Sequence, residues 1–153
     1  MAVEVGDQAP DFELKDQHGT PVRLSGFRGA KNVVLVFYPL AFSGVCTGEL
    51  CAIRDEFPEV NQDDVELLTV SVDSTFTHRA WSDAEHFSFG LLSDFWPHGE
   101  LAKTYGVFND GSGMANRGTF LIDKDGVIRF SEVNEPGIPR DQDEWLDAIG
   151  KLV

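Results

Sequence analysis

Cysteine and basic residues are scarce in this chain of 153 residues. It has only two Cys, and its 12 Lys and Arg stand against 26 Asp and Glu, which gives a formal net charge of −14. Two cysteines are too few for the disulfide framework of a small secreted protein, and in a reducing compartment such residues are more often reactive or free. The negative charge repels phosphate backbones and anionic membrane surfaces, so we expect no nucleic-acid or membrane partner. A solvated surface and a salt-adapted host would both account for this charge.

Long apolar runs are also missing. No segment approaches the about 18 consecutive apolar residues of a membrane-spanning helix, and the N-terminal segment lacks the basic and apolar regions of a signal peptide, so we expect a cytoplasmic protein. There is no internal repeat or linker-like tract, and the length suffices for one core. The sequence therefore predicts a single domain over residues 1–153. Glycine-rich nucleotide or flavin fingerprints are absent and the four His are dispersed, so we expect neither a cofactor nor a metal ion.

Strand-like and helix-like segments alternate along the chain. Val33–Tyr38 is a continuous apolar, β-branched run typical of a buried central strand, and Asp125-Gly126 suits a tight turn between two strands. The helical pattern after Cys46 should end before Pro58, because proline removes a helical hydrogen bond. This alternation predicts an α/β fold with a central mixed sheet flanked by helices. The predicted strands are Phe12–Lys15, Pro21–Leu24, Val33–Tyr38, Leu67–Val72, Thr119–Asp123 and Val127–Ser131, and the predicted helices are Val45–Phe57, His78–Glu85, Gly99–Tyr105 and Asp141–Leu152.

Cys46 lies between a strand-like run and a helical pattern, which places its sulfur in the first turn of a helix. Unpaired backbone N–H groups and the positive end of the helix dipole favour the ionised thiolate there, and the thiolate is the reactive form of cysteine. A buried core thiol is the alternative, because free cysteines are among the most buried residues. The preceding Ser43-Gly44 indicates an exposed, polar setting instead, so we favour a nucleophile.

The spacing of Pro39, Ser43 and Cys46 resembles the P-x-x-x-(T/S)-x-x-C signature of the peroxiredoxins, which are thiol-dependent peroxidases with a thioredoxin-like fold. Other segments extend the resemblance, in the family's order, over most of the chain. Phe95–His98 and Asn116–Gly118 resemble the alkyl hydroperoxide reductase E group, whereas a second cysteine five residues after the first resembles the Q-type (bacterioferritin comigratory protein-like) group. The other segments are Pro10–Phe12, Leu92–Asp94, Tyr105–Val107, Arg117–Asp123 and Asp125-Gly126.

This resemblance implies a role for each polar residue near Cys46. Pro39 would shield the thiolate from solvent, the Ser43 hydroxyl would hydrogen-bond the peroxide, and Arg117 would face both sulfur and substrate. A guanidinium suits that role because it stays charged and presents several fixed donors, although a surface arginine at the start of a strand is the alternative. Glu49 lies one helical turn after Cys46. It would either pair with an arginine of the site or be a first-turn acid stabilised by the helix dipole.

Cys51 follows Cys46 by five residues. The Q-type resemblance implies a resolving cysteine that forms a disulfide with oxidised Cys46, and a small core residue is the alternative. In an intact helix two such residues are about 7.5 Å apart along the axis and point to different faces. A disulfide needs Cα atoms within about 7 Å, so the first turns of the helix would have to unwind. Gly48 between the two cysteines makes unwinding easier.

The sequence favours a peroxidase that reduces hydrogen peroxide, organic hydroperoxides and peroxynitrite through a Cys46 sulfenic acid. Cys51 or an external thiol would resolve that acid, and the external reductant would be thioredoxin, a mycoredoxin-like glutaredoxin or a low-molecular-weight thiol. The alternative is a peroxide sensor or thiol redox relay that acts on a partner protein, whereas a disulfide oxidoreductase would need Cys-x-x-Cys. The family's habit implies a homodimer. Four aromatic residues would form either an apolar collar, a dimer surface or part of the core: Phe42, Phe95, Trp96 and Phe108.

Overall fold

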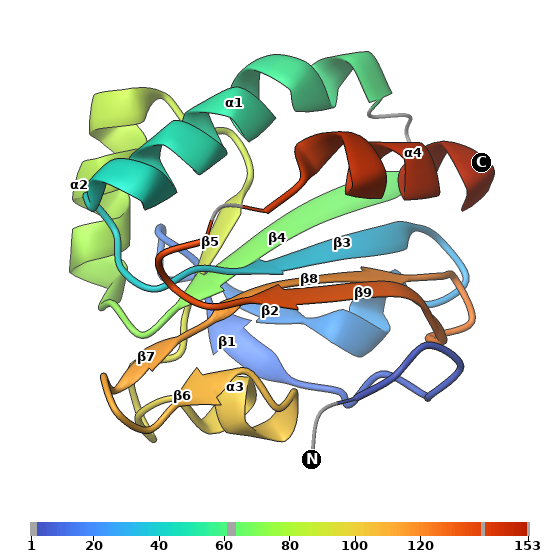
Figure 1. Cartoon of the computed structure of the whole chain (residues 1–153), viewed down its shortest axis with the longest axis horizontal. Coiled ribbons are helices and arrows are strands. Elements are labelled where there is room, and N and C mark those ends of the chain that lie inside the picture. Colours follow the sequence, from blue (N-terminus) through green and yellow to red (C-terminus); the bar gives the residue numbers. More distant parts are fainter. Residues whose placement is uncertain (1–2, 61–63, 139, 153) are drawn as a thin grey trace.

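A five-stranded mixed sheet forms the centre of the computed structural model, which describes residues 3–60, 64–138 and 140–152 (Figure 1). The strand order is β5-β4-β3-β8-β9. β3 and β4 are parallel, as are β4 and β5, whereas β8 is antiparallel to both β3 and β9. The predicted α/β fold with a central mixed sheet is therefore confirmed. The strands are β3 (Asn32–Phe37), β4 (Val65–Ser71), β5 (Gly90–Ser93), β8 (Arg117–Ile122) and β9 (Ile128–Asn134).

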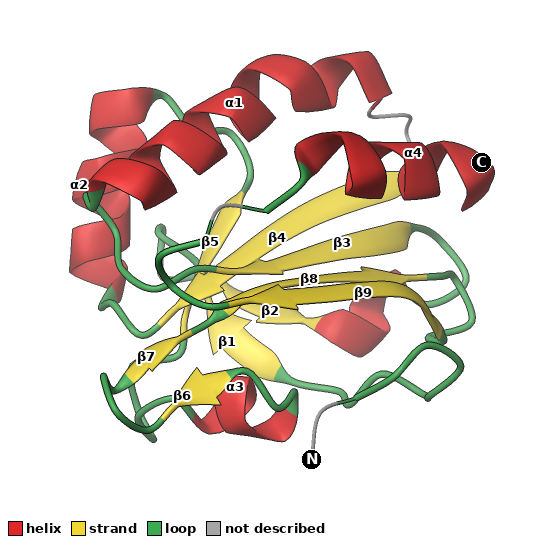
Figure 2. Cartoon of the chain, in the orientation of Figure 1, coloured by secondary structure: helices red, strands yellow, loops and turns green. Residues whose placement is uncertain are grey.

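Helices α1 (Gly44–Val60) and α4 (Gln142–Leu152) lie side by side over one face of this sheet, and α2 (Thr75–Glu85) packs beside β5 (Figure 2). The other side of the sheet carries the short elements. None of the helices in the described part of the chain is long and apolar enough to cross a membrane. The short elements are β1 (Glu13–Lys15), β2 (Pro21–Arg23), the 3-10 helix η1 (Leu24–Phe27), α3 (Glu100–Thr104), β6 (Phe108–Asn109) and β7 (Met114–Ala115).

Successive residues of β3 point to opposite faces of the sheet, as the period of a strand requires. Val34 and Val36 pack with Ile53 of α1 and Ile149 of α4. The alternate residues of the strand face the second cluster, which includes Tyr105 and reaches the short elements. All six residues of β3 are buried, which explains why its sequence is continuously apolar after Asn32.

Two predicted helix boundaries are wrong. α1 continues past Pro58 to Val60, because proline removes only its own N–H from the ladder and contacts with α4 support the helix. α2 begins at Thr75, three residues before the predicted start at His78, because the Ser74 side chain accepts a hydrogen bond from the Thr77 N–H at 3.2 Å and caps the helix. The remaining predicted strands and helices are present, with ends that differ by up to three residues.

The topology brings three distant parts of the chain to one edge of the sheet. The carboxyl ends of β3, β4 and β5 lie at this edge because the three strands are parallel. β8 runs the other way, so it begins there, and β9 ends there. The segment after β3, the first residue of β8 and the segment after β9 therefore meet, and they supply the residues described next.

Candidate active site

Cys46 is the third residue of α1, in its first turn, as the sequence predicts. The prediction of an exposed setting is wrong, because the residue is 0% exposed. Its side chain points inward, where it packs in a cluster with Tyr38, Leu50 and Trp81. The thiol is therefore shielded from bulk water by apolar groups, although it remains in contact with one polar neighbour.

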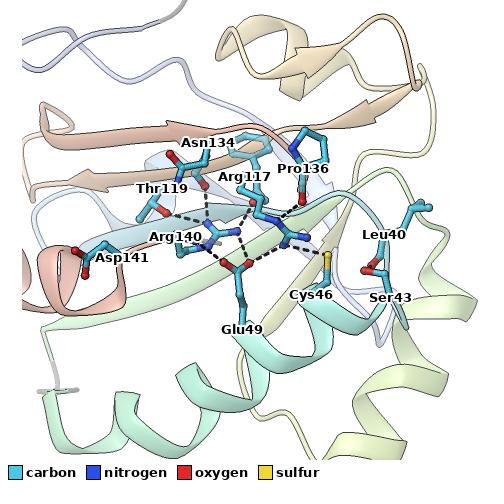
Figure 3. A network of polar contacts seen from close by, with 12 residues as sticks. Leu40, Ser43, Cys46, Glu49, Arg117, Thr119, Asn134, Pro136, Arg140 and Asp141 are labelled. Atoms are coloured by element: carbon cyan, nitrogen blue, oxygen red, sulfur yellow. Dashed lines mark hydrogen bonds and ion pairs between the residues drawn. The ribbon is translucent and has the colours of Figure 1, made fainter. Parts of the chain in front are cut away.

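That neighbour is Arg117, the first residue of β8 (Figure 3). Its Nη1 lies 3.2 Å from Cys46 Sγ and 2.6 Å from Glu49 Oε1, and its Nε donates to the Pro136 carbonyl oxygen at 2.8 Å. A guanidinium NH₂ group carries two hydrogens, so Nη1 can serve the sulfur and the carboxylate at once. The alternative of a surface arginine is wrong, because Arg117 is buried. Of the two readings of Glu49, the structure shows pairing with arginine.

Arg140, which the sequence analysis missed, completes the network from the segment after β9. Its backbone N–H donates to Glu49 Oε2 at 2.8 Å, and its Nη2 lies 3.2 Å from Glu49 Oε1. The guanidinium also donates to the carbonyl oxygens of Phe37 and Gly118 and to the Thr119 hydroxyl, at 2.8 to 3.1 Å. Burial lowers the pKa of Arg140, and Glu49 opposes that shift. Arg140 is 91 positions from Glu49, and no local spacing in the sequence links the two.

Positive groups gather beside Cys46. Two guanidinium groups, Arg117 and Arg140, share one carboxylate, Glu49, and all three residues are buried. Arg117 thus presents a cation to the sulfur at 3.2 Å. Electrostatic stabilisation of this kind is strong where water is excluded. The arrangement can hold an anionic sulfur and can stabilise a second anion that develops beside it.

Ser43 and Pro39 lie in the segment between β3 and α1. The Ser43 hydroxyl donates to the Leu40 carbonyl oxygen at 3.0 Å, so its proton is used within the loop and its lone pairs can accept a hydrogen bond. Pro39 is buried directly after Tyr38. The position of Pro39 is compatible with shielding of the Cys46 thiolate, and that of Ser43 with a hydrogen bond to the peroxide. Both roles stay predictions.

Comparison with known proteins identifies the family. The AhpC/TSA family model matches residues 5–131, most of the chain. The chain belongs to the AhpC/TSA family of peroxiredoxins. It is 53% identical over 150 residues to alkyl hydroperoxide reductase E of Mycobacterium tuberculosis, with 98% of each chain covered. It is 42% identical over 156 residues to the chloroplastic 2-Cys peroxiredoxin BAS1 of Hordeum vulgare, which covers 97% of this chain and 74% of the relative.

Solved structures agree with this assignment. AhpC of Enterococcus faecalis superposes on this peroxiredoxin with a TM-score of 0.87 at 32% identity, covering 99% of this chain and 92% of the other. Peroxidoxin BcpB of Mycobacterium tuberculosis gives a TM-score of 0.82 at 33% identity, covering 98% of both. These neighbours confirm the predicted thioredoxin-like fold. As a peroxiredoxin, the protein is a thiol-dependent peroxidase, an oxidoreductase that reduces a peroxide at the expense of a thiol.

The second cysteine of this peroxiredoxin lies on α1, and both cysteines are free thiols. Cys51 is half-buried, and its Sγ lies 3.3 Å from the Glu85 carboxylate oxygen Oε2 on α2. Burial, followed by this hydrogen bond, raises the pKa of the Cys51 thiol, whereas the charge of Arg54 lowers it. The helix is intact between the two cysteines. Disulfide formation would therefore require the unwinding that the spacing predicts.

Three of the four aromatic residues that were considered for a collar or a dimer surface are exposed. Trp96 has 81% of its surface accessible, and Phe42 and Phe95 each expose more than half. Phe108 is half-buried against the core. The core alternative is therefore wrong for the first three residues and holds for Phe108. Contact of the exposed residues with a second subunit stays a prediction.

Proposed function

We propose that Cys46 is the peroxidatic cysteine of this enzyme. The observation that carries the proposal is the 3.2 Å contact between Cys46 Sγ and Arg117 Nη1 within a buried network of two guanidinium groups and the Glu49 carboxylate. The helix N-terminus adds the positive end of its dipole on the same thiol. Together they supply what a nucleophilic thiolate needs.

The Cys46 thiolate attacks one peroxide oxygen and the O–O bond breaks. The other oxygen leaves as hydroxide or alkoxide, which takes up a proton, or as nitrite when the substrate is peroxynitrite. The sulfur is oxidised to sulfenic acid while the peroxide is reduced to water, an alcohol or nitrite. Arg117 donates to the sulfur and stabilises charge on the leaving oxygen, and Ser43 accepts a hydrogen bond from the peroxide. Pro39 keeps water from the thiolate. Hydrogen peroxide, organic hydroperoxides and peroxynitrite are the proposed substrates.

Reduction of the sulfenic acid follows one of two routes. Cys51 attacks it, releases water and leaves a Cys46–Cys51 disulfide, which an external thiol then reduces. Otherwise the external thiol itself forms a mixed disulfide with Cys46 and releases water, and a second thiol completes the reduction. Thioredoxin, a mycoredoxin-like protein and a low-molecular-weight thiol are the candidate reductants. We also propose that residues 1–153 form one peroxiredoxin domain that acts in the cytoplasm as a homodimer.

Rapid mixing with hydrogen peroxide and with an organic hydroperoxide tests the assignment. The wild type and Cys51→Ser should each lose one thiol to sulfenic acid at a high rate, and a thiol reductant should restore it over repeated turnovers. Cys46→Ser should consume no peroxide while keeping its fold by circular dichroism. Peroxide consumption by Cys46→Ser at the wild-type rate would contradict the proposal. Fast oxidation without turnover by any of the three reductants would favour the sensor.

A further inference from the structure

A network of polar side chains holds the loop between β3 and α1 in place. Asp73 lies in the connection between β4 and α2, with 13% of its side chain exposed. Its carboxylate oxygen Oδ2 accepts the Ala41 N–H at 2.8 Å and the Ser71 hydroxyl at 2.6 Å. The Ser93 hydroxyl donates to the Asp73 carbonyl oxygen at 2.6 Å. The Asp73 carboxylate oxygen thus joins the loop before α1 to the end of β4, and the Asp73 backbone carbonyl joins the same residue to the end of β5.

His78 of α2 also belongs to this network. Its Nε2 lies 2.6 Å from the Ser71 oxygen and 3.0 Å from the Tyr38 hydroxyl. The Ser71 hydroxyl, which His78 contacts, donates to Asp73 Oδ2, so this oxygen is the acceptor for both Ser71 and Ala41.

The loop that Asp73 supports is strained and leads directly to Cys46. Phe42 has a φ of 67°, in the left-handed region that a non-glycine residue seldom adopts. Its ring lies 6.0 Å from that of Trp81, and the N–H of the preceding residue, Ala41, is the one bound by Asp73. The Ser43 carbonyl oxygen then accepts the Thr47 N–H at 2.8 Å in the first turn of α1. Such a conformation persists only when neighbouring contacts impose it.

We propose that Asp73 is a positioning residue for peroxide reduction, whose Oδ2 holds the Ala41 peptide and thereby keeps Ser43 and the first turn of α1 aligned for attack by Cys46. This rests on the proposed role of Cys46. The role needs an acceptor oxygen at this point and does not need its charge. Without the acceptor, the strained loop relaxes and the peroxide is no longer held in line with the sulfur.

Three variants separate the acceptor from the charge and from general stability. Asp73→Ala removes the oxygen. Asp73→Asn keeps an oxygen that can accept from both Ala41 and Ser71, and its NH₂ group takes the place of the other carboxylate oxygen. Ser82→Ala is the matched control, because it deletes a buried hydrogen bond of α2, from Ser82 Oγ to the Phe87 carbonyl oxygen at 3.1 Å, without touching the loop. Each variant is mixed with hydrogen peroxide under single-turnover conditions, and amide hydrogen exchange is followed at Ala41.

Asp73→Ala should oxidise about tenfold to a hundredfold more slowly than wild type, since misplacement of a reacting group by about 1 Å has an effect of that size. Asp73→Asn should stay close to the wild-type rate, and so should Ser82→Ala. The Ala41 amide should be protected in all proteins except Asp73→Ala. A wild-type rate in Asp73→Ala, or an Asp73→Asn variant as slow as Asp73→Ala, would overturn the proposal.

Amide exchange also separates this proposal from that for Cys46, because it requires no peroxide. Slow oxidation of the wild type together with a protected Ala41 amide would contradict the proposed role of Cys46 and would leave the contact between Asp73 and Ala41 intact. An Ala41 amide that exchanges in the wild type as fast as an unstructured peptide would overturn the Asp73 role, even if Asp73→Ala failed to fold.

Discussion

The carboxylate of Glu49 lies 2.6 Å from the guanidinium of Arg117, and both side chains are almost fully buried. A buried ion pair of this kind contributes little net stability, because the cost of removing both charges from water offsets their attraction. Its effect is geometric, since the carboxylate fixes the nitrogen that also meets Cys46. Removing either partner therefore changes both the charge of the network and the contact that Arg117 makes with the sulfur.

Replacement of Arg117 by Ala should slow the oxidation of Cys46 by about a hundredfold to a thousandfold, because the cation at the sulfur and at the leaving oxygen is lost. Arg117→Lys should restore little of the rate, because an ammonium lacks the planar fork that reaches Cys46, Glu49 and Pro136 together. Stopped-flow oxidation measures the rate, and wild-type speed in Arg117→Ala would contradict the role.

Glu49→Gln removes the negative charge that both guanidinium groups contact. It keeps the shape of the side chain but leaves two buried guanidinium groups without a carboxylate, so we expect a loss of about 3–5 kcal/mol in the free energy of unfolding. The peroxide rate should fall as well, because Arg117 is no longer oriented. Denaturant unfolding measures the first effect and stopped-flow oxidation the second.

Glu13→Gln is the control for this variant, since the pair of Glu13 with Arg23 is about half exposed on both sides, at 52% and 58%. Its stability should change by less than about 0.5 kcal/mol. A Glu49→Gln protein as stable as this control would show that the buried charge is compensated in another way.

Cys51 should form a disulfide with oxidised Cys46, seen by mass spectrometry as a loss of two hydrogens and a linked peptide after one equivalent of peroxide. Cys51→Ser should instead accumulate sulfenic acid and over-oxidise at lower peroxide concentration. Glu85→Gln removes the carboxylate that helps raise the pKa of the Cys51 thiol, so the disulfide should form faster near pH 7. Persistent sulfenic acid in the wild type, with equal over-oxidation of both proteins, would leave Cys51 as a packing residue.

Acid should destabilise the fold partly through His78. Burial lowers the pKa of His78 to about 4, although the charge of Asp73, 3.9 Å away, favours the protonated form. The unfolded chain, with a His pKa of about 6.5, then binds a proton that the folded chain does not. The stability that His78 contributes is therefore complete above pH 6.5 and is lost as the pH falls from about 6.5 to about 4, at up to about 1.4 kcal/mol per pH unit.

His78→Gln isolates this contribution, because glutamine keeps an N–H donor and does not titrate. The free energy of unfolding of wild type and variant is measured between pH 7 and pH 4 by denaturant titration. The wild type should lose more stability over this interval than the variant, since all carboxylates are common to both. Parallel pH profiles would show that folding does not lower the pKa of His78.

Much of the fold follows from local patterns in the sequence. The apolar run that became β3 and the Asp125-Gly126 turn between β8 and β9 were both correctly predicted, because a buried strand and a tight turn each impose a composition on consecutive residues. The errors lie at helix ends. Ser74 caps α2 earlier than the apolar pattern begins, and Pro58 does not end α1, because capping and packing outweigh the average preference of a residue.

The sequence by itself determined that Cys46 would stand in the first turn of a helix after a buried strand, with Glu49 one turn further on, since these are relations within a few residues. Only the tertiary structure decided that Arg117 and Arg140 would share that carboxylate, that the thiol would be buried, and that Asp73 would support the loop. These contacts depend on the order and direction of the strands, which bring one edge of the sheet together from distant segments. The whole chain reaches its lowest free energy in this arrangement, so a short stretch of neighbouring residues does not determine it.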